Sequence, residues 1–172
     1  VTENNIDFKN FSANVNWRHQ FDSTGRELTA DVDYITYDRH AEMLLETIPF
    51  DKFGQLGGTM MLRGDLPSSI KIASFKSDYV HPFKDGRFEA GIKASYVENS
   101  HLVVYNKKID DQWHHDNRSN HFDYEENINA AYVNLNKQFG KWSLQGGLRV
   151  ENTNATGYQR VTSDKFDRDT TN

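Results

Sequence analysis

The sequence predicts an all-β fold, an antiparallel up-and-down meander of about six strands. Three pairs of runs that alternate apolar and polar residues lead to this prediction, at residues 11–37, 70–99 and 131–152. Within each pair the two runs meet at a very short turn, and the apolar phase is the same on both sides of it. Tight hairpins whose side chains point to opposite faces with a period of two require this agreement.

Each hairpin turn contains a glycine, and two-residue loops are expected at Thr24-Gly25, Asp85-Gly86 and Gly140-Lys141. Loops of this length fix the partner of every strand residue. One face of each hairpin is then apolar and the other polar. The expected apolar pairs are Trp17–Val32, Tyr79–Ile92 and Val133–Leu148, and the expected polar pairs are Arg18–Asp31, Asp78–Lys93 and Asn136–Gln145.

Composition limits the classes of function. The net charge of -5 argues against a nucleic-acid surface, which requires clustered lysine and arginine. The absence of cysteine excludes disulfides, thiolate metal sites and thiol catalysis. No apolar run approaches the roughly 18 residues of a membrane-spanning helix, whereas a transmembrane strand needs only about ten alternating residues. We expect one β-barrel segment over residues 1–172, excised from a larger protein.

The connections differ in length between the two ends of the strands. Short turns are expected at one end and long polar loops, at residues 38–69 and 99–121, at the other. Membrane barrels combine short periplasmic turns with long extracellular loops. Aromatic residues gather at two levels of the apolar face, as in the girdles of such barrels. The alternative is a soluble extracellular β-sheet module that binds a ligand or partner through its long loops.

Several stretches resemble outer-membrane β-barrel proteins grouped with the TonB-dependent receptors of Gram-negative bacteria. The similarity spans residues 62–160 and is most specific in 126–159, where Tyr132-Val133-Asn134, the Gly-Lys turn and Gly147-Leu148-Arg149-Val150-Glu151-Asn152 follow one another. The resemblance implies a large barrel that is closed by a plug domain and takes up nutrients with energy passed from the inner membrane. It implies outer-membrane lipid, a plug and a TonB-type coupling system as partners, and it brings no catalytic residues. We expect residues 1–172 to be a segment of the barrel without the plug domain.

Candidate chemistry outside this resemblance is sparse. Trp113-His114-His115-Asp116 is the cluster most like a metal site, but a third ligand at diagnostic spacing is missing, so a polar loop is expected. Arg63-Gly64-Asp65 is interpreted as turn residues before Pro67 rather than as an adhesion motif. We expect no enzyme activity, no metal site and no cofactor.

The polar face carries the remaining functional prediction. Its mixed charges fit the lining of a filled lumen better than an ion-selective pore. With its apolar face and two strand edges open, the isolated fragment is expected to self-associate. The residues expected to face the lumen in pairs are Arg18, Asp31, Asp78, Lys93, Arg149 and Glu151.

Overall fold

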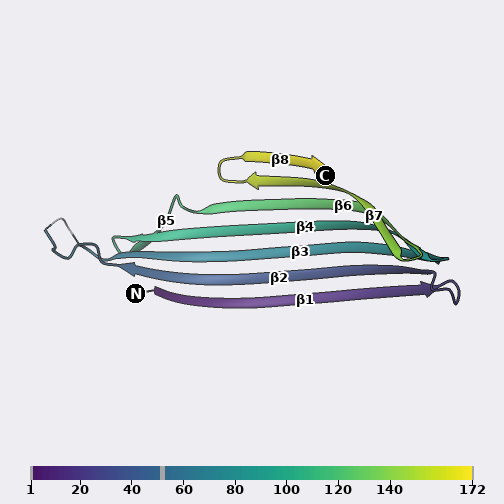
Figure 1. Ribbon diagram of the computed structural model, residues 1–172. Coiled ribbons are helices and arrows are strands. Elements are labelled where there is room, and N and C mark those ends of the chain that lie inside the picture. The colour runs from purple at the N-terminus through teal and green to yellow at the C-terminus, as the bar shows by residue number, and fades with distance from the viewer. Residues whose placement is uncertain (1, 51–52, 172) are drawn as a thin grey trace.

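A computed structural model describes residues 2–50 and 53–171, and these residues form one antiparallel sheet of eight strands (Figure 1). The strand order is β1-β2-β3-β4-β6-β7-β8, with the short β5 paired to β4. The predicted all-β meander is confirmed. The strands are β1 (Thr2–Gln20), β2 (Glu27–Thr47), β3 (Met60–Phe83), β4 (Gly86–Ile109), β5 (Gln112–His115), β6 (Asn120–Phe139), β7 (Trp142–Gln159) and β8 (Asp164–Thr171).

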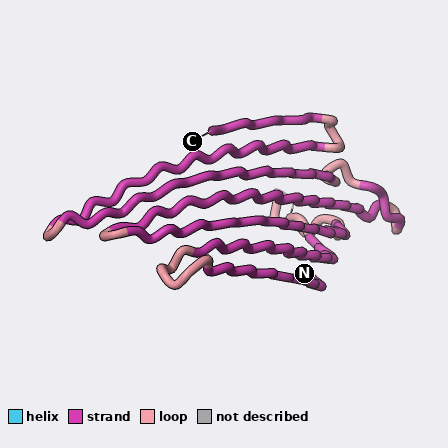
Figure 2. Tube along the Cα trace, turned by 90° about the vertical axis from the view of Figure 1, so that its right-hand side faces the viewer, coloured by secondary structure: helices cyan, strands magenta, loops and turns pink. Residues whose placement is uncertain are grey.

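Most strands are far longer than a bilayer requires. β3 and β4 have 24 residues each, and β7 has 18, against about 9–11 for a transmembrane strand. They run side by side along most of the molecule in both views (Figures 1 and 2). β1 and β8 are the two ends of the strand order, so the described sheet is open.

The third predicted hairpin register is confirmed. Phe139 pairs with Trp142 across a loop of Gly140 and Lys141, and Val133 pairs with Leu148. Gly140 has a φ of 59°, a left-handed conformation that glycine adopts without the steric cost of a side chain.

The first predicted register is wrong by two residues. Trp17 pairs with Ala30 rather than Val32, because the turn is longer than two residues. The Phe21 N–H donates to the Arg26 carbonyl at 2.9 Å, which leaves four residues to make the turn. The Asp22 carboxylate accepts hydrogen bonds from both the backbone N–H and the hydroxyl of Thr24, and this local cap closes the longer loop.

The second predicted register is also wrong by two residues, in the same direction. Phe83 pairs with Gly86 around a loop of Lys84 and Asp85, and Asp85 takes the left-handed conformation with a φ of 57°. Gly86 has a different role from the one expected. A Cβ there would lie within 2.5 Å of the Phe83 ring, so glycine is required for packing rather than for the turn.

The two long polar loops predicted at 38–69 and 99–121 are largely strand. β2 and β3 extend through the first segment, up to Thr47 and from Met60 onward. β4 continues to Ile109 and turns through Asp110 and Asp111, both with positive φ, into β5. Positive φ at both central residues is the geometry of a tight hairpin turn that asparagine, aspartate and glycine favour.

The sheet has little buried core. Among the described residues, the buried apolar side chains are Ala41, Ala130 and Ala155. No helix in these residues has the length and apolar character to cross a membrane. Order in this sheet therefore depends on the backbone ladders between long neighbouring strands.

The corrected register of the second hairpin gives a direct test. Lys76 lies opposite Lys93, whereas the two-residue loop at Asp85-Gly86 would place Asp78 there. In this cysteine-free chain, Lys76→Cys with Lys93→Cys should oxidise to a disulfide, measured by a mobility shift on non-reducing gels. The matched pair Asp78→Cys with Lys93→Cys should stay reduced, because a diagonal separation exceeds disulfide reach. Cross-linking of only the second pair would restore the predicted register.

Candidate functional site

The registers divide the side chains between two faces of the sheet. Each strand pair places odd-numbered residues opposite even-numbered ones. The Trp17 face, as we call it, carries the odd-numbered residues of β1, β3, β6 and β8 and the even-numbered residues of β2, β4 and β7. The Asp78 face carries the others. Both faces change character along the strands.

Near the short turns, the Trp17 face is an exposed apolar band. Val15 is 66% exposed, Leu148 77% and Trp142 80%. Soluble monomers rarely expose contiguous apolar patches of more than a few hundred Å². The band comprises Phe11, Ala13, Val15, Trp17, Leu28, Ala30, Val32, Tyr34, Ala73, Phe75, Tyr79, Phe83, Phe88, Ala90, Ile92, Ala94, Tyr96, Ala131, Val133, Leu135, Phe139, Trp142, Leu144, Leu148 and Val150.

The upper edge of the band slants across the strands. In β1 the band ends at Phe11. Following the paired residues from Phe11 across the sheet, one strand at a time, leads to Thr156 in β7. In β7, however, the band ends at Val150, six residues nearer the turns. Six residues are about 20 Å along a strand, and five strand spacings are about 24 Å. A level band therefore requires strands tilted by about 40°, which is the tilt of membrane barrels.

The height of the band also fits a bilayer. In β3 it runs from Ala73 to Phe83, ten residue steps. Ten steps are about 33 Å along the strand, and at a tilt of about 40° they span about 25 Å along the membrane normal. Outer-membrane barrels carry an outward apolar belt of this height.

Over the same stretch the Asp78 face is polar and internally paired. The amides of Asn14 and Asn16 donate to Asp33 and Asp31, which lie directly opposite, at 2.7 and 2.5 Å. Arg18 forms its ion pair with Glu27 at 2.6 Å. The predicted Arg18–Asp31 pair is therefore wrong, because the longer first turn moves Asp31 opposite Asn16.

At the centre of this face, Asp78 joins two neighbours. It accepts a hydrogen bond from the Tyr132 hydroxyl at 2.5 Å and pairs with Lys76 at 2.5 Å. Gly91 lies directly opposite, and a Cβ there would meet both Asp78 and the Tyr132 ring at 2.4 Å. Glycine thus lets the tyrosine of β6 reach across β4 to β3. The predicted Asp78–Lys93 pair is wrong, because the register shift places Lys93 opposite Lys76.

The register nevertheless keeps all the predicted lumen residues on one face. A shift of two residues preserves the face of every side chain, so Arg18, Asp31, Asp78 and Lys93 lie on the Asp78 face. Arg149 and Glu151 also lie there and pair with each other at 2.5 Å. Within this stretch, positive and negative groups neutralise one another locally.

Beyond the apolar band the two faces exchange character. The Trp17 face becomes polar, with a row that runs Lys9, Asp38, Ser69, Ser100 and Asp123 across five strands. The Asp78 face becomes apolar over the same stretch. Its apolar residues include Ile35, Tyr37, Ala41, Met43, Leu45, Leu62, Leu66, Ile70, Ile72, Val97, Val103, Tyr105, Phe122, Tyr124 and Ile128.

Beyond β5, a tight polar turn connects to β6. Asp116, 7% exposed, accepts hydrogen bonds from the backbone and side chain of Arg118. The hydrogen bond from the Arg118 side chain holds the pKa of the Asp116 carboxyl well below its usual value. This carboxylate is thus engaged in closing the turn.

The other two sequence motifs lie in strands. His114 and His115 belong to β5 and are exposed. The described residues hold no group of three histidine, cysteine or acidic side chains arranged to bind a metal ion. Arg63-Gly64-Asp65 lies inside β3 rather than in a turn, and Asp65 pairs with His40 at 2.9 Å.

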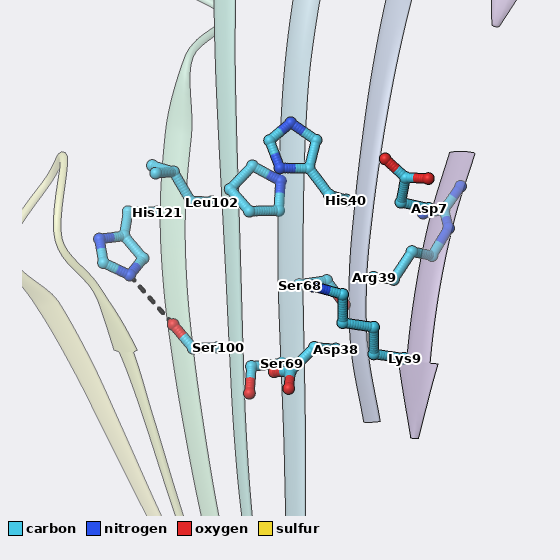
Figure 3. Close-up of a pocket in the computed structure, with 11 residues that line it drawn as sticks. Asp7, Lys9, Asp38, Arg39, His40, Ser68, Ser69, Ser100, Leu102 and His121 are labelled. Atoms are coloured by element: carbon cyan, nitrogen blue, oxygen red, sulfur yellow. Dashed lines mark hydrogen bonds between the residues drawn. The ribbon is translucent and has the colours of Figure 1, made fainter. Parts of the chain in front are cut away.

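A hollow of about 700 Å³ opens on the Trp17 face just beyond the apolar band (Figure 3). The small residues Ser69 and Ser100 lie opposite each other in it, and Pro67 lies two residues beyond Ser69. Asp7, Lys9, Asp38, Arg39, His40, Ser68, Leu102 and His121 complete the lining. Sequence reasoning missed the hollow, because its residues come together only through the registers of five strands.

Comparison with protein families decides which interpretation applies. Residues 19–172 match the model of the outer membrane protein beta-barrel family. The chain belongs to the outer membrane beta-barrel family. This barrel chain is therefore located in the cell outer membrane, and its exposed band is explained. Family membership replaces the alternative of a soluble extracellular module.

Solved structures similar to this outer-membrane barrel chain include two larger proteins. One is the ferric citrate transporter FecA in its unliganded form, with 11% identity and a TM-score of 0.44 over 86% of this chain. The other is the ferric yersiniabactin uptake receptor FyuA from Yersinia pestis, with 9% identity and a TM-score of 0.39 over 86%. The chain spans 23% and 24% of their lengths. A search of curated proteins finds no match.

The hydrogen bond from Tyr132 to Asp78 should contribute measurably to the stability of the barrel. Tyr132→Phe removes a donor to a charged acceptor, so the free energy of unfolding should fall by about 1–2 kcal/mol. Denaturant unfolding of the full-length protein in lipid vesicles measures the change. Tyr34→Phe, which removes a hydroxyl from the Trp17 face, is the control and should cost less than about 0.5 kcal/mol. Equal losses in the two variants would show that the hydrogen bond to Asp78 adds nothing to the free energy of unfolding.

Proposed function

We propose that this chain forms part of the wall of an outer-membrane receptor that takes up a nutrient. The observation that carries the proposal is the pairing of an apolar, lipid-suited Trp17 face with a self-neutralised Asp78 face at the same height. The Asp78 face would line the lumen, with Arg18, Asp31, Asp78, Lys93, Arg149 and Glu151 among its residues. The sequence resemblance over residues 62–160 supports a receptor of the TonB-dependent type.

The charge pattern supports a lumen that is filled rather than an open ion pore. Ion-selective pores use rings of one sign, whereas here acids and bases alternate and pair, as Arg18 does with Glu27 and Arg149 with Glu151. Such a lining leaves few free charges to select an ion. It suits contact with another polar protein surface, which a plug domain would supply.

The exchange of character beyond the band supports the same arrangement. Where strands project out of a membrane, the outer surface meets water and should be polar. An apolar inner surface at that height, as at Ile70, Ile72 and Ile128, requires interior material that excludes water. We infer that a plug or inward-folded segment of the parent protein occupies this region.

The remaining partners follow from this proposal. Outer-membrane lipid would cover the apolar band, and a TonB-type system would supply energy. Without these partners the isolated segment would hide its band and its open edges, β1 and β8, through self-association.

The proposal also orients the wall. The short turns, with Asp85 in one of them, would face the periplasm, and the strand extensions with His115 would face outward. Single cysteines at these two positions in the full-length protein can be probed on intact cells with a membrane-impermeant thiol reagent. Labelling at His115→Cys but not at Asp85→Cys is expected. The reverse pattern would invert the orientation.

Uptake itself is tested by genetics. A strain lacking the full-length gene should grow more slowly than its complemented parent when one bulky nutrient is limiting, across a panel of ferric chelates, corrinoids and oligosaccharides. The advantage of the complemented strain should vanish when the energy-coupling system is inactivated. An advantage that persists without coupling would indicate passive diffusion. Equal growth on every nutrient would contradict the uptake role.

A further inference from the structure

The hollow on the Trp17 face lies at the height where lipid headgroups meet the wall. In β1 the apolar band ends at Phe11, and Lys9 of the hollow lies two positions, or about 7 Å, farther from the short turns. A lipid whose chains lie against the band would therefore place its headgroup at the hollow. On β1 the hollow adjoins the band directly, whereas on the same face of β3 Lys71 lies between Ser69 and Ala73 and pairs with Glu98 at 3.7 Å.

The shape of the hollow has a clear structural cause. Ser69 and Ser100 are directly paired, and their short side chains leave space between the longer ones of Asp38 and Asp123 on either side. In the next row, Pro67 lies between His40 and Leu102, and its ring has no N–H for the ladder. A volume of about 700 Å³ is in the range of small-molecule sites.

Several polar groups of the hollow are already fixed in place. Ser100 donates to Asp123 at 2.7 Å and contacts the His121 imidazole at 3.2 Å (Figure 3). On the opposite side, the His40 imidazole lies 2.9 Å from the Asp65 carboxylate. Two imidazoles thus stand at opposite sides of a floor made of serine and proline. Such groups offer both donors and acceptors to a ligand.

The charges of the rim argue for a polyhydroxylated ligand. On the Trp17 face two carboxylates, Asp7 and Asp38, stand beside one cation, Lys9, whereas Arg39 belongs to the opposite face of β2. These three groups leave a net negative charge, whereas sites for anionic headgroups are clusters of lysine and arginine. Carboxylates and imidazoles can instead accept and donate hydrogen bonds to sugar hydroxyls, and Leu102 and Pro67 offer apolar surface to a sugar ring.

From this arrangement we propose that the hollow binds the sugar headgroup of a membrane glycolipid whose acyl chains lie along the apolar band. The site would hold one lipid against the outside of the wall, separate from the transport path through the lumen. It depends on the outer-membrane location of the chain and not on the nutrient that the receptor carries.

Retention of lipid by the full-length protein tests the proposal. The protein is reconstituted in phosphatidylcholine vesicles that contain equal minor fractions of glucosyl-diacylglycerol and phosphatidylglycerol, then extracted gently and examined by native mass spectrometry. Glucosyl-diacylglycerol should be retained about threefold or more above its fraction in the vesicle, a modest affinity difference. Retention at the vesicle fraction, or preference for phosphatidylglycerol, would overturn the proposal.

Two variants locate the site. Ser69→Phe fills the floor of the hollow and should reduce the retained glycolipid to its vesicle fraction. Ser143→Phe, at an exposed serine on the Asp78 face of β7, is the matched control and should retain it fully. Asp38→Asn keeps the shape but removes one carboxylate acceptor and should lower retention if Ser69→Phe fails to fold. Unchanged retention in Asp38→Asn and in any folded Ser69→Phe protein would place the lipid elsewhere.

Discussion

The wall depends on one constraint, which is that a strand in lipid must satisfy its backbone polar groups through its neighbours while its side chains alternate between lipid and interior. The inner strands of the described sheet meet the first requirement through antiparallel ladders on both sides, whereas β1 and β8 are paired on one side. The alternation then makes one face apolar and the opposite face polar at the same height. The slant of the band across the strands follows from strand tilt.

Beyond the apolar band the side chains still alternate between the two faces, but the polar and apolar faces are exchanged. In the proposed orientation, water replaces lipid around the Trp17 face, and its residues change from Ala73 and Tyr96 to Lys71 and Glu98 within two positions. The Asp78 face changes in the opposite sense, from Lys76 and Asp78 to Ile70 and Ile72. A polar exterior with an apolar interior is the order of a water-soluble protein, so in the proposed orientation each long strand combines a membrane segment with a segment that has the pattern of a water-soluble protein.

This exchange explains how far sequence alone could predict the fold. The meander and the faces of the side chains could be predicted, because period-two alternation survives a register error of two residues. The parts of the strands beyond the apolar band could not be predicted. Their apolar residues lie on the other face, so the alternation is interrupted and the sequence looks like a polar loop. Two of the three turns were also predicted wrongly. In the first hairpin, Asp22 and Thr24 close a loop that is longer than two residues. In the second, Gly86 is needed for packing rather than for the turn. The Tyr132–Asp78 contact and the hollow could not be predicted either, because both depend on the observed registers.

The central claim is that Ile92 faces lipid while its neighbour Lys93 faces the interior, and nitroxide labels can test it. Single labels at these two positions in the full-length protein, reconstituted in lipid vesicles, report collision with oxygen, which concentrates in lipid, and with a water-soluble nickel chelate. The label at Ile92, which is 54% exposed, should relax mainly with oxygen and the one at Lys93 should not, with the alternation repeating from Phe88 to Tyr96. Oxygen contact at Lys93 in place of Ile92, or no alternation along β4, would contradict the account.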